Sequence, residues 1–302
     1  MRLAAPAVAL ALIGLPVPAA MREPALAVRV PGGWETWWQA DAAPSAWRAA
    51  LPAVTDRVVW KQASPGVEWG ELSLSGDGEA FRVRVIVARL DPSLLRFELV
   101  KPADGKVFAG RWSVDEAADD AVFAVNAGQF TDQPWGWVVQ DGVERQAPGR
   151  GPLAPGVVVD GNGVVRLVSP DSLSMIRGEA RVAFQSYPTL LSGDGEVPLP
   201  LQLDGLGIDR EHRDARLALG LQRDGKVIIA MTRFEALGGV LANIPLGLTT
   251  PEMAAVMGAL GASSAVLLDG GISSQMMIRS AAGAEVWTGW RRVALGLVAV
   301  PR

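Results

Sequence analysis

The sequence predicts an α+β protein, a strand-rich mixed sheet domain with few helices, and three observations support this class. Apolar and polar residues alternate over residues 67–74 and 81–90, which is the period of half-buried strands. The "SGDGEA" between these runs supplies Gly and Asp, which favour hairpin turns. A clear helical pattern covers residues 249–261. The 302 residues suffice for one large core, and we expect a single domain over residues 65–302.

The first 27 residues have the features of a secretory signal peptide. Arg2 precedes an apolar stretch over residues 3–18, and small residues follow it. Cleavage after Ala20 or after Ala27 fits this pattern, and the alternative is a membrane anchor. Two prolines and the short apolar length argue against a spanning helix. We therefore expect a periplasmic or secreted protein that has no stable membrane span after cleavage.

Residues 28–64 are rich in Trp, Ala and Pro and show no clear period, so we interpret them as an N-terminal extension that packs on the domain. A second hairpin is predicted over residues 215–233, with Asp224 and Gly225 in its turn. The other predicted strands are short apolar or alternating runs. They cover residues 95–102, 121–125, 136–139, 156–159, 164–169, 180–191, 265–268 and 291–300.

Two helices are predicted from their capping residues. Ser113 suits an N-cap and Glu116 the matching capping-box position, which predicts a short helix before the strand at 121–125. In the longer helix, Thr250 suits the N-cap and Pro251 the first helical position. Gly261 then marks the end of that helix.

Composition excludes several classes of chemistry. The net charge of −4 gives no electrostatic basis for binding nucleic acid. The chain has no Cys, which excludes disulfides, a thiolate nucleophile and a zinc–thiolate site. Its one His, His212, excludes a multi-His metal site and would have to serve any Ser-His-Asp triad. We expect no cofactor, and a metal, if one is used, would be Ca²⁺ or Mg²⁺ among oxygen ligands.

The segment "LLDGGISSQ" places a carboxylate at the end of a buried apolar run. Asp269 is followed by Gly270 and Gly271, which let a ligand approach the backbone, and by the hydroxyls of Ser273 and Ser274. Such a turn can hold an anion or a sugar, or support a carboxylate base or nucleophile. The alternative is a tight turn in which the carboxylate caps local amides.

Three further segments carry polar residues at strand ends. Asn126 ends one predicted strand, and Gly128 follows in "NAGQF". Gln185 and Ser186 stand before the bend "YP", and Arg216 begins the second hairpin, where it could bind phosphate bidentately. Two of these segments have a plain structural alternative: turn chemistry for Asn126 and a solvent-facing edge charge for Arg216. His212, among charged neighbours, is expected on a surface loop.

Taken together and in chain order, these four segments resemble those of the phosphodiester glycosidase family, to which the uncovering enzymes belong. The resemblance covers about residue 121 to the C-terminus, including the closing strand "RRVALGLVAV". One departure is Ile272, which stands where the family commonly has a third glycine and is expected to narrow access to the backbone beside Asp269. The matching segments are "NAGQF" (126–130), "QSYP" (185–188), "RLALG" (216–220) and the predicted helix leading to "DGGISS" (269–274).

The resemblance implies an exported hydrolase that cleaves a sugar-1-phosphodiester, so that its partner is a glycan or sugar-phosphodiester substrate. It implies that Arg216 binds the phosphate. It further implies that Asp269 acts as nucleophile, as base toward water, or as the electrostatic partner of an oxocarbenium-like transition state. The groups expected to hold sugar hydroxyls or phosphate oxygens are Asn126, Gln185, Ser186, Ser273 and Ser274, with the backbone at Gly128, Gly270 and Gly271.

Two other functions remain open on the sequence alone. An envelope protein could use the same glycine-rich turns to bind a glycan without cleaving it. A serine hydrolase would require His212 beside Ser273 or Ser274.

Tryptophans near the motifs could stack on sugar rings, although core packing is the ordinary role of each. They are Trp135, Trp137, Trp287 and Trp290.

Overall fold

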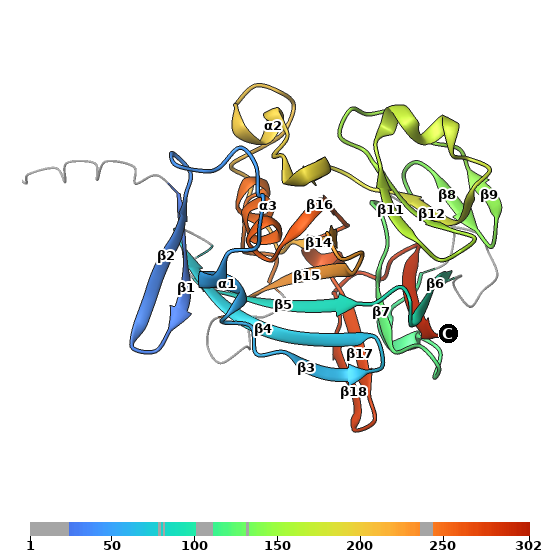
Figure 1. The fold of residues 1–302 in the computed structure, drawn as a ribbon, viewed down its shortest axis with the longest axis horizontal. Helices are drawn as coiled ribbons and strands as arrows, with labels where there is room; N and C mark the ends of the chain where they lie inside the picture. The colour runs from blue at the N-terminus through green and yellow to red at the C-terminus, as the bar shows by residue number, and fades with distance from the viewer. Residues whose placement is uncertain (1–23, 78–79, 81, 101–110, 131–132, 236–243) are drawn as a thin grey trace, which may run out of the picture.

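The computed structural model describes residues 24–77, 80, 82–100, 111–130, 133–235 and 244–302. These residues form three β-sheets, short helices and connecting loops (Figure 1). The expected strand-rich α+β class is confirmed. We expected a mixed sheet, but every pairing between the named strands of this described part is antiparallel.

The largest sheet has nine strands in the order β13-β16-β14-β15-β5-β4-β1-β2, with β3 also paired to β4. Residues 28–64, expected as an extension, supply β2, β3 and half of β1, so they are built into this sheet. The strands are β1 (Ala25–Val30), β2 (Gly33–Gln39), β3 (Lys61–Ser64), β4 (Val67–Gly76), β5 (Val83–Leu90), β13 (Thr189–Leu191), β14 (Leu217–Gln222), β15 (Val227–Phe234) and β16 (Ala262–Leu267).

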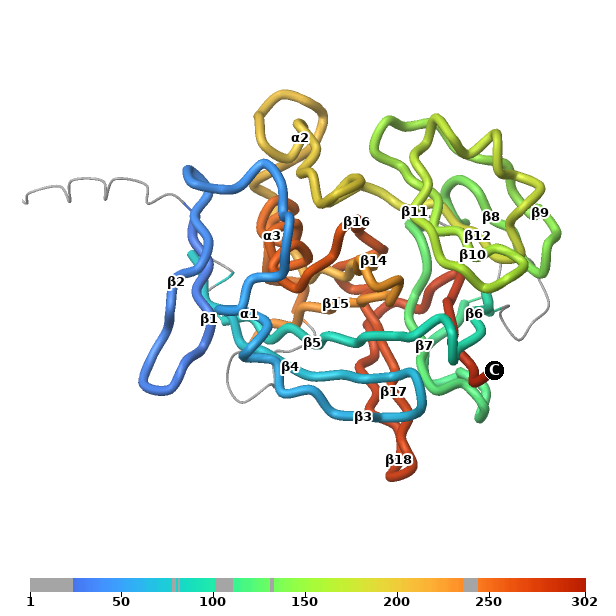
Figure 2. The backbone as a smooth tube through the Cα atoms, viewed as in Figure 1, coloured from blue at the N-terminus to red at the C-terminus, as the bar shows by residue number. Residues whose placement is uncertain are grey.

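Two five-stranded sheets complete the fold, and Figure 2 shows the green β8–β12 region as a lobe beside the large sheet. The first has the order β11-β10-β12-β8-β9 and the second β18-β17-β7-β19-β6. The strands of the first are β8 (Val138–Gln140), β9 (Val143–Gln146), β10 (Gly156–Asp160), β11 (Val165–Val168) and β12 (Ala180–Gln185). The strands of the second are β6 (Leu95–Val100), β7 (Phe123–Asn126), β17 (Met276–Ser280), β18 (Gly283–Trp287) and β19 (Gly296–Pro301).

Both predicted hairpins are present. β4 pairs with β5, and β14 pairs with β15 through a turn in which Gly225 has φ +84°. Glycine suits that turn because other residues rarely adopt positive φ. Part of the turn predicted at 75–80, residues 78–79, lies outside the described residues.

The central strands are buried on both faces, which explains their continuous apolar runs. Ala218 of β14 and Ile228 of β15 face a core shared with the helix α3 (Thr250–Ala259). The alternating neighbours Leu217 and Leu219 face a second core between all three sheets. The end of β16, where Asp269 follows, is therefore held by packing on both sides.

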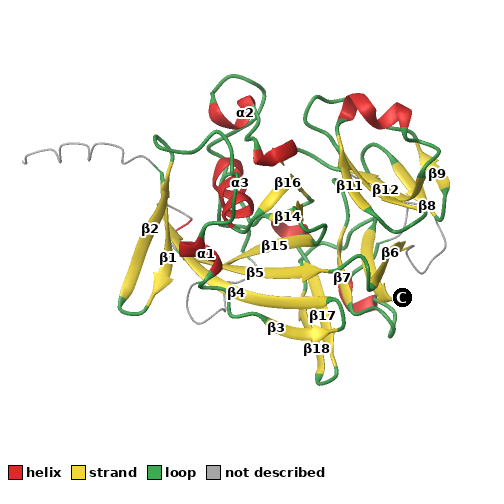
Figure 3. Cartoon of the chain, viewed as in Figure 1, coloured by secondary structure: helices red, strands yellow, loops and turns green. Residues whose placement is uncertain are grey.

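The predicted long helix is α3 (Thr250–Ala259), which covers one face of the nine-stranded sheet (Figure 3). Its N-cap is Thr249, not Thr250, because Thr249 keeps extended dihedrals while Thr250 is already helical. The Thr249 hydroxyl accepts from the Glu252 amide at 3.3 Å, and the Glu252 carboxylate accepts from the Thr249 amide at 2.9 Å. The expected Gly261 stop holds, with φ +89° directly after the C-cap residue Leu260.

The helix predicted after Ser113 is a single 3₁₀ turn, Val114–Glu116, and the Ser113 side chain makes no capping bond. Glu116 instead pairs with Arg292. None of the helices within the described ranges is long and apolar enough to cross a membrane. The other short helices are α1 (Pro52–Thr55), α2 (Leu199–Gln202) and the 3₁₀ turns Pro170–Met175, Gly193–Gly195 and Gly271–Ser273.

Candidate active site

A pocket of about 320 Å³ lies where β14 begins and β16 ends, and both Asp269 and Arg216 line it. These two strands are antiparallel neighbours, so the start of one meets the end of the other. The loop before β14 forms a second wall, and Gln129 and Tyr187 contribute from other parts of the chain. Of the predicted site residues Asp269, Arg216 and Asn126, the first two therefore share one open pocket.

The third residue, Asn126, lies behind the pocket. Its side chain is fully buried, and its Nδ2 donates to the backbone oxygen of Asp269 at 2.7 Å. Its Oδ1 accepts from the Gln275 amide at 3.2 Å. The Asp269 amide in turn donates to the Gly128 carbonyl at 2.8 Å. Asn126 and Gly128 both hold the backbone of Asp269, and neither lines the pocket, so their contact with substrate stays a prediction.

Burial sets the protonation of Asp269. It raises the pKa of this carboxyl to about 6, while a hydrogen bond from Ser273 and the charge of Arg291 act in the opposite direction. The neighbouring charge of Asp214 raises the pKa further. The Oδ2 atom is buried and has no hydrogen-bond partner in the described structure. Asp269 is thus a carboxylate at neutral pH that binds a proton more readily than an exposed aspartate.

The two glycines after Asp269 are required by close packing. A Cβ atom at Gly270 would lie 2.5 Å from the Ala215 carbonyl oxygen. Gly271 has φ +58°, and a Cβ there would lie 2.8 Å from the Asp214 carboxylate. The Gly271 amide donates to the Ala215 carbonyl at 2.7 Å. The Gly-Gly pair therefore allows the turn to approach the start of β14 and brings Asp214 close to Asp269.

Arg216 is held at the pocket by its own backbone and by carbonyl groups. Its amide donates to the Thr232 hydroxyl at 2.6 Å, which fixes the start of β14. Its Nε donates to the Leu248 carbonyl at 2.9 Å and its Nη2 to the His212 carbonyl at 2.5 Å. Burial lowers the pKa of this guanidinium, and nearby carboxylates offset part of that effect. The described contacts of Arg216 include no ion pair with Asp269, so donors remain for an anion.

The loop that forms the second wall is anchored by a buried ion pair. Arg213 donates to both oxygens of the Glu252 carboxylate, at 2.7 and 2.9 Å. Glu252 is fully buried and also belongs to the capping box of α3. A bidentate pair of this kind fixes orientation as well as distance. The loop therefore has a defined position relative to α3 and to the pocket.

This loop brings three titratable residues to the pocket that were not predicted there: Asp209, His212 and Asp214. The Asp209 carboxylate accepts two backbone amides, and these bonds lower its pKa. His212 is exposed, as expected, but its Nε2 lies 3.9 Å from Asp214 Oδ2. In the sequence, Asp214 stands two residues before Arg216, close to the start of the predicted hairpin. This position was the available sequence signal for Asp214.

Two further predicted site residues, Gln185 and Ser186, are buried and bond to the protein itself. The Gln185 side chain is buried and makes four bonds: it accepts from the Trp137 and Gly149 amides, both at 2.7 Å, and donates to the Ala154 and Gly149 carbonyls at 2.9 and 3.3 Å. The fully buried Ser186 hydroxyl donates to the Leu267 carbonyl. Neither residue lines the pocket.

The two serines of the turn are also buried. Ser273 donates to Asp269 and lowers its pKa, whereas the Ser274 hydroxyl has no partner in the described part of the chain. Neither serine lines the pocket in which His212 lies, so the geometry does not support a serine hydrolase. Ile272 is 41% exposed and lies outside the pocket lining, so it does not narrow the approach to Asp269 from that side.

The tryptophans near the motifs do not line the pocket. Trp137 is fully buried and donates to Glu144 at 3.0 Å, and Trp287 packs edge-on against Trp69. Trp290 is 62% exposed, and its amide donates to the Ile272 carbonyl in the Asp269 turn at 2.8 Å. The aromatic residue inside the pocket is Tyr187. Within the described ranges, no group of three His, Asp or Glu residues is placed to hold a metal ion.

The fold and this pocket define a strand-rich α+β protein with a carboxylate and a guanidinium at the meeting ends of two strands. The chain matches the sequence model of the phosphodiester glycosidase family (NAGPA) over residues 119–300, more than half of its length. It belongs to the phosphodiester glycosidase family. No curated protein matches it in sequence.

Two solved structures are similar in fold. One is the zebrafish N-acetylglucosamine-1-phosphodiester alpha-N-acetylglucosaminidase catalytic domain auto-inhibited by its pro-peptide, with a TM-score of 0.61 and 17% identity over 84% of this chain and 87% of that one. The other is a hypothetical protein from Synechocystis, with a TM-score of 0.56 and 16% identity over 83% of this chain and 65% of that one. At these identities the similarity shows the fold alone.

Proposed function

We propose that the protein is an exported hydrolase that cleaves a sugar-1-phosphodiester. One observation carries this proposal: Asp269 and Arg216 line the same open pocket without pairing with each other, in a chain of the phosphodiester glycosidase family. A closed ion pair would have left neither group available. An unpaired guanidinium can bind the phosphate, and an unpaired carboxylate can act at the sugar.

The reaction breaks the bond between the anomeric carbon and the phosphate oxygen. The oxygen of water forms the new bond to that carbon, and the phosphate leaves with the bonding electron pair as a phosphomonoester. Arg216 binds the phosphate and stabilises the charge that grows on it. The leaving group is already acidic, so little general-acid assistance is required. One proton of the water passes to the carboxylate or to solvent.

Asp269 supplies negative charge at the anomeric carbon. All three roles considered for it, nucleophile, base and electrostatic partner, require the ionised carboxylate. Its raised pKa of about 6 makes it a better proton acceptor than an ordinary aspartate. Asp214 is one of two further carboxylates that line the same pocket, and its carboxylate packs against Gly271. We assign Asp214 the supporting role of raising the pKa of Asp269.

Export is the other part of the proposal. The N-terminal sequence supports a signal peptide, and the fold favours the earlier of its two cleavage sites. Strand β1 begins at Ala25, and Leu26 is fully buried in the core. Cleavage after Ala27 would remove half of this strand, whereas cleavage after Ala20 would keep it. N-terminal sequencing of the exported protein would show which bond is cut.

The experiment is turnover of sugar-1-phosphodiesters by the purified protein and by an Asp269→Asn variant, with and without Ca²⁺ or Mg²⁺. Released reducing sugar and phosphomonoester should appear in equal amounts with the wild-type protein only. Turnover that Asp269→Asn leaves unchanged would contradict the role of Asp269. Binding without turnover by both proteins would favour the alternative, an envelope protein that binds a glycan without cleaving it.

A further inference from the structure

We infer that the substrate is a polymer of sugars joined by phosphodiesters, and that it extends from the Asp269 pocket along α3 to a second, arginine-lined pocket. This inference rests on the proposed function, because it places one linkage of the polymer at Asp269. It adds a binding site remote from the reacting bond. The supporting observations are two further hollows along α3 and the residues that line them.

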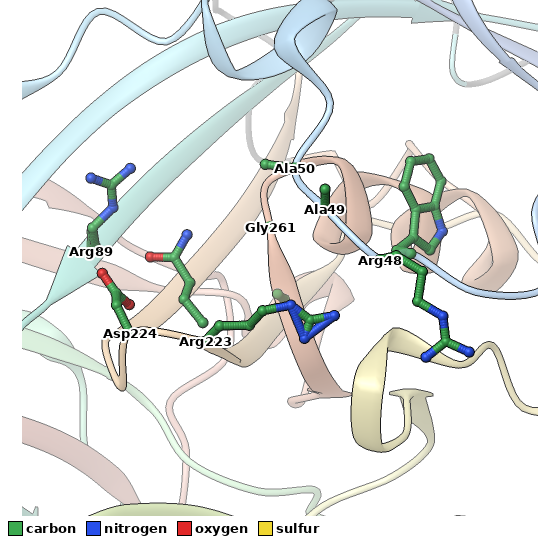
Figure 4. A pocket seen from close by; sticks show the side chains of 10 residues that line it. Arg48, Ala49, Ala50, Arg89, Arg223, Asp224 and Gly261 are labelled. Carbon is green, nitrogen blue, oxygen red and sulfur yellow. The ribbon is translucent and has the colours of Figure 1, made fainter.

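The arginine pocket has a volume of about 400 Å³ and lies where Gly261 and Ala262 lead from α3 into β16. It is thus at the opposite end of β16 from Asp269. Three guanidinium groups and one carboxylate line it, and Figure 4 shows Arg223 reaching across the pocket toward the side where Arg48 lies. The third guanidinium, Arg89, pairs with Glu68 at 3.3 Å. The ion pairs of Arg48 and Arg223 are longer and more exposed, so these two are the groups suited to an incoming anion.

Arg48 pairs with the Glu196 carboxylate at 3.6 Å, and Asp194 contacts both of these arginines. Its carbonyl accepts from Arg48 at 3.0 Å, and its carboxylate lies 3.7 Å from Arg223. These are surface contacts, with the Asp194 side chain 80% exposed and the Arg223 side chain 47% exposed. Exposed ion pairs of this kind add little stability. A phosphate that bonds to guanidinium groups bidentately can replace them.

An aromatic hollow of about 180 Å³ is lined by Pro251, Ala254 and Ala255 of α3, which stand between Thr250 of the Asp269 pocket and Gly261 of the arginine pocket. Trp47 lines both the arginine pocket and this hollow. Arg210 and Pro251 also line this hollow, and they are the chain neighbours of Asp209 and Thr250 in the Asp269 pocket. The three hollows therefore follow one another along α3, whose ten residues span about 15 Å.

Trp47 is held in place along this path. A Cβ atom at Gly258 of α3 would lie 2.1 Å from the Trp47 ring, so the ring is seated directly on the helix backbone. Trp37 packs against it edge-on with ring centroids 6.3 Å apart. Trp38 lines the same hollow. A fixed aromatic surface between two cationic sites suits a chain in which sugar rings alternate with phosphates.

The test compares two substrates and two double variants. The substrates are poly(N-acetylglucosamine 1-phosphate) and the methyl phosphodiester of N-acetylglucosamine 1-phosphate. Arg48→Gln/Arg223→Gln removes the two cations of the arginine pocket. Arg166→Gln/Arg177→Gln removes the same charge from other exposed ion pairs, with Glu179 and Glu144. Thermal melting confirms that both variants fold.

We expect Arg48→Gln/Arg223→Gln to lower kcat/KM for the polymer about tenfold, the loss of about one charge-assisted contact, and to leave the methyl diester unchanged. The control variant should match wild type on both substrates. An equal loss on both substrates, or none on the polymer, would overturn the inference. An equal loss for the control variant would mean that net charge, not this pocket, is responsible.

Binding separates this inference from the proposed function. Polymer affinity is measured in the Asp269→Asn background, where no turnover is needed, with single-stranded DNA as a second polyanion. The inference requires about tenfold weaker polymer binding when Arg48 and Arg223 are also replaced. If wild type cleaves neither substrate, the proposed function fails while this binding result still decides the site. Similar weakening for DNA would show a general anion surface and overturn the glycan assignment.

Discussion

Two groups of polar side chains surround the end of β16, and they differ in whether the protein satisfies them. Gln185 makes four bonds to the protein and lies fully buried behind the turn. Asp269, on the pocket side, has one carboxylate oxygen with no partner among the described residues. Polar groups that are buried and fully bonded stabilise one backbone arrangement, whereas incompletely bonded ones are candidates for ligand contact.

The comparison divides the motif residues that were predicted together. Asn126, Gln185 and Ser186 belong to the bonded group, and their bonds position the strand ends on which the pocket is built. Asp269 and Arg216 belong to the pocket group. A motif in sequence therefore marks a site without showing which of its residues touch the ligand.

The largest expected effect is on turnover, from Asp269→Asn. The change keeps the size of the side chain but removes its charge, so the transition state loses its negative partner. We expect kcat to fall about 10³-fold, with the fold retained. Circular dichroism and the rate of sugar release on one sample are the measurements. A kcat within a few-fold of wild type would move Asp269 to the supporting group.

Arg216→Gln is expected to have the next largest effect. It removes the charge that binds the phosphate, and kcat/KM for a sugar-1-phosphodiester should fall about 10²-fold. Arg213→Gln is the contrasting variant, because Arg213 pairs with buried Glu252 and not with substrate. The Arg213→Gln variant should be clearly less stable than wild type, while the activity of each folded molecule should change little. If the two variants behave alike, Arg216 is a structural residue.

Gln185→Ala should act on stability. It leaves the buried Trp137 amide and the half-buried Gly149 amide without an acceptor, which costs about 2–4 kcal/mol of unfolding free energy. Gln146→Ala, which removes a single bond to the Pro134 carbonyl, should cost about 1 kcal/mol or less. Urea unfolding measures both. Full stability with lost activity in Gln185→Ala would place that residue in contact with substrate.

The smallest effect is a gain in stability from Asp269→Asn that depends on pH. The pKa of Asp269 is raised on folding, to about 6, so the folded protein holds this proton more tightly than the unfolded chain. Stability from this group is present at low pH and is lost as pH rises toward 6. Asp269→Asn removes this loss of stability at high pH. We therefore expect the variant to be on the order of 1–2 kcal/mol more stable than wild type at pH 7.5. The difference should vanish near pH 4.

Much of the fold could be predicted because local patterns agreed with it. The alternation in β4 and β5, the Asp224–Gly225 turn and the Pro251–Gly261 helix limits are local signals, and the structure has all of them. The N-cap was misplaced by one residue because Thr249 and Thr250 are adjacent and chemically equivalent. Packing of the helix and the Thr249–Glu252 bonds decide between them.

The pocket was only partly predictable. Asp269 and Arg216 stand at strand ends, a position that sequence reveals. The loop carrying Asp209 and His212 has no periodic pattern, and its place depends on the distant Arg213–Glu252 pair. The supporting role of Asn126 depends on a bond across 143 residues to the backbone of Asp269. Long-range contacts of this kind leave no local trace in the sequence.

The most direct test of the account is the pH dependence of kcat/KM for a sugar-1-phosphodiester. The reaction needs Asp269 ionised, so activity should rise with pH through a midpoint near 6. Asp214→Asn removes a charge that raises the pKa of Asp269, and it should move this midpoint to lower pH. A profile that is flat or falling between pH 5 and 7 would contradict a reactive Asp269 carboxylate in this pocket.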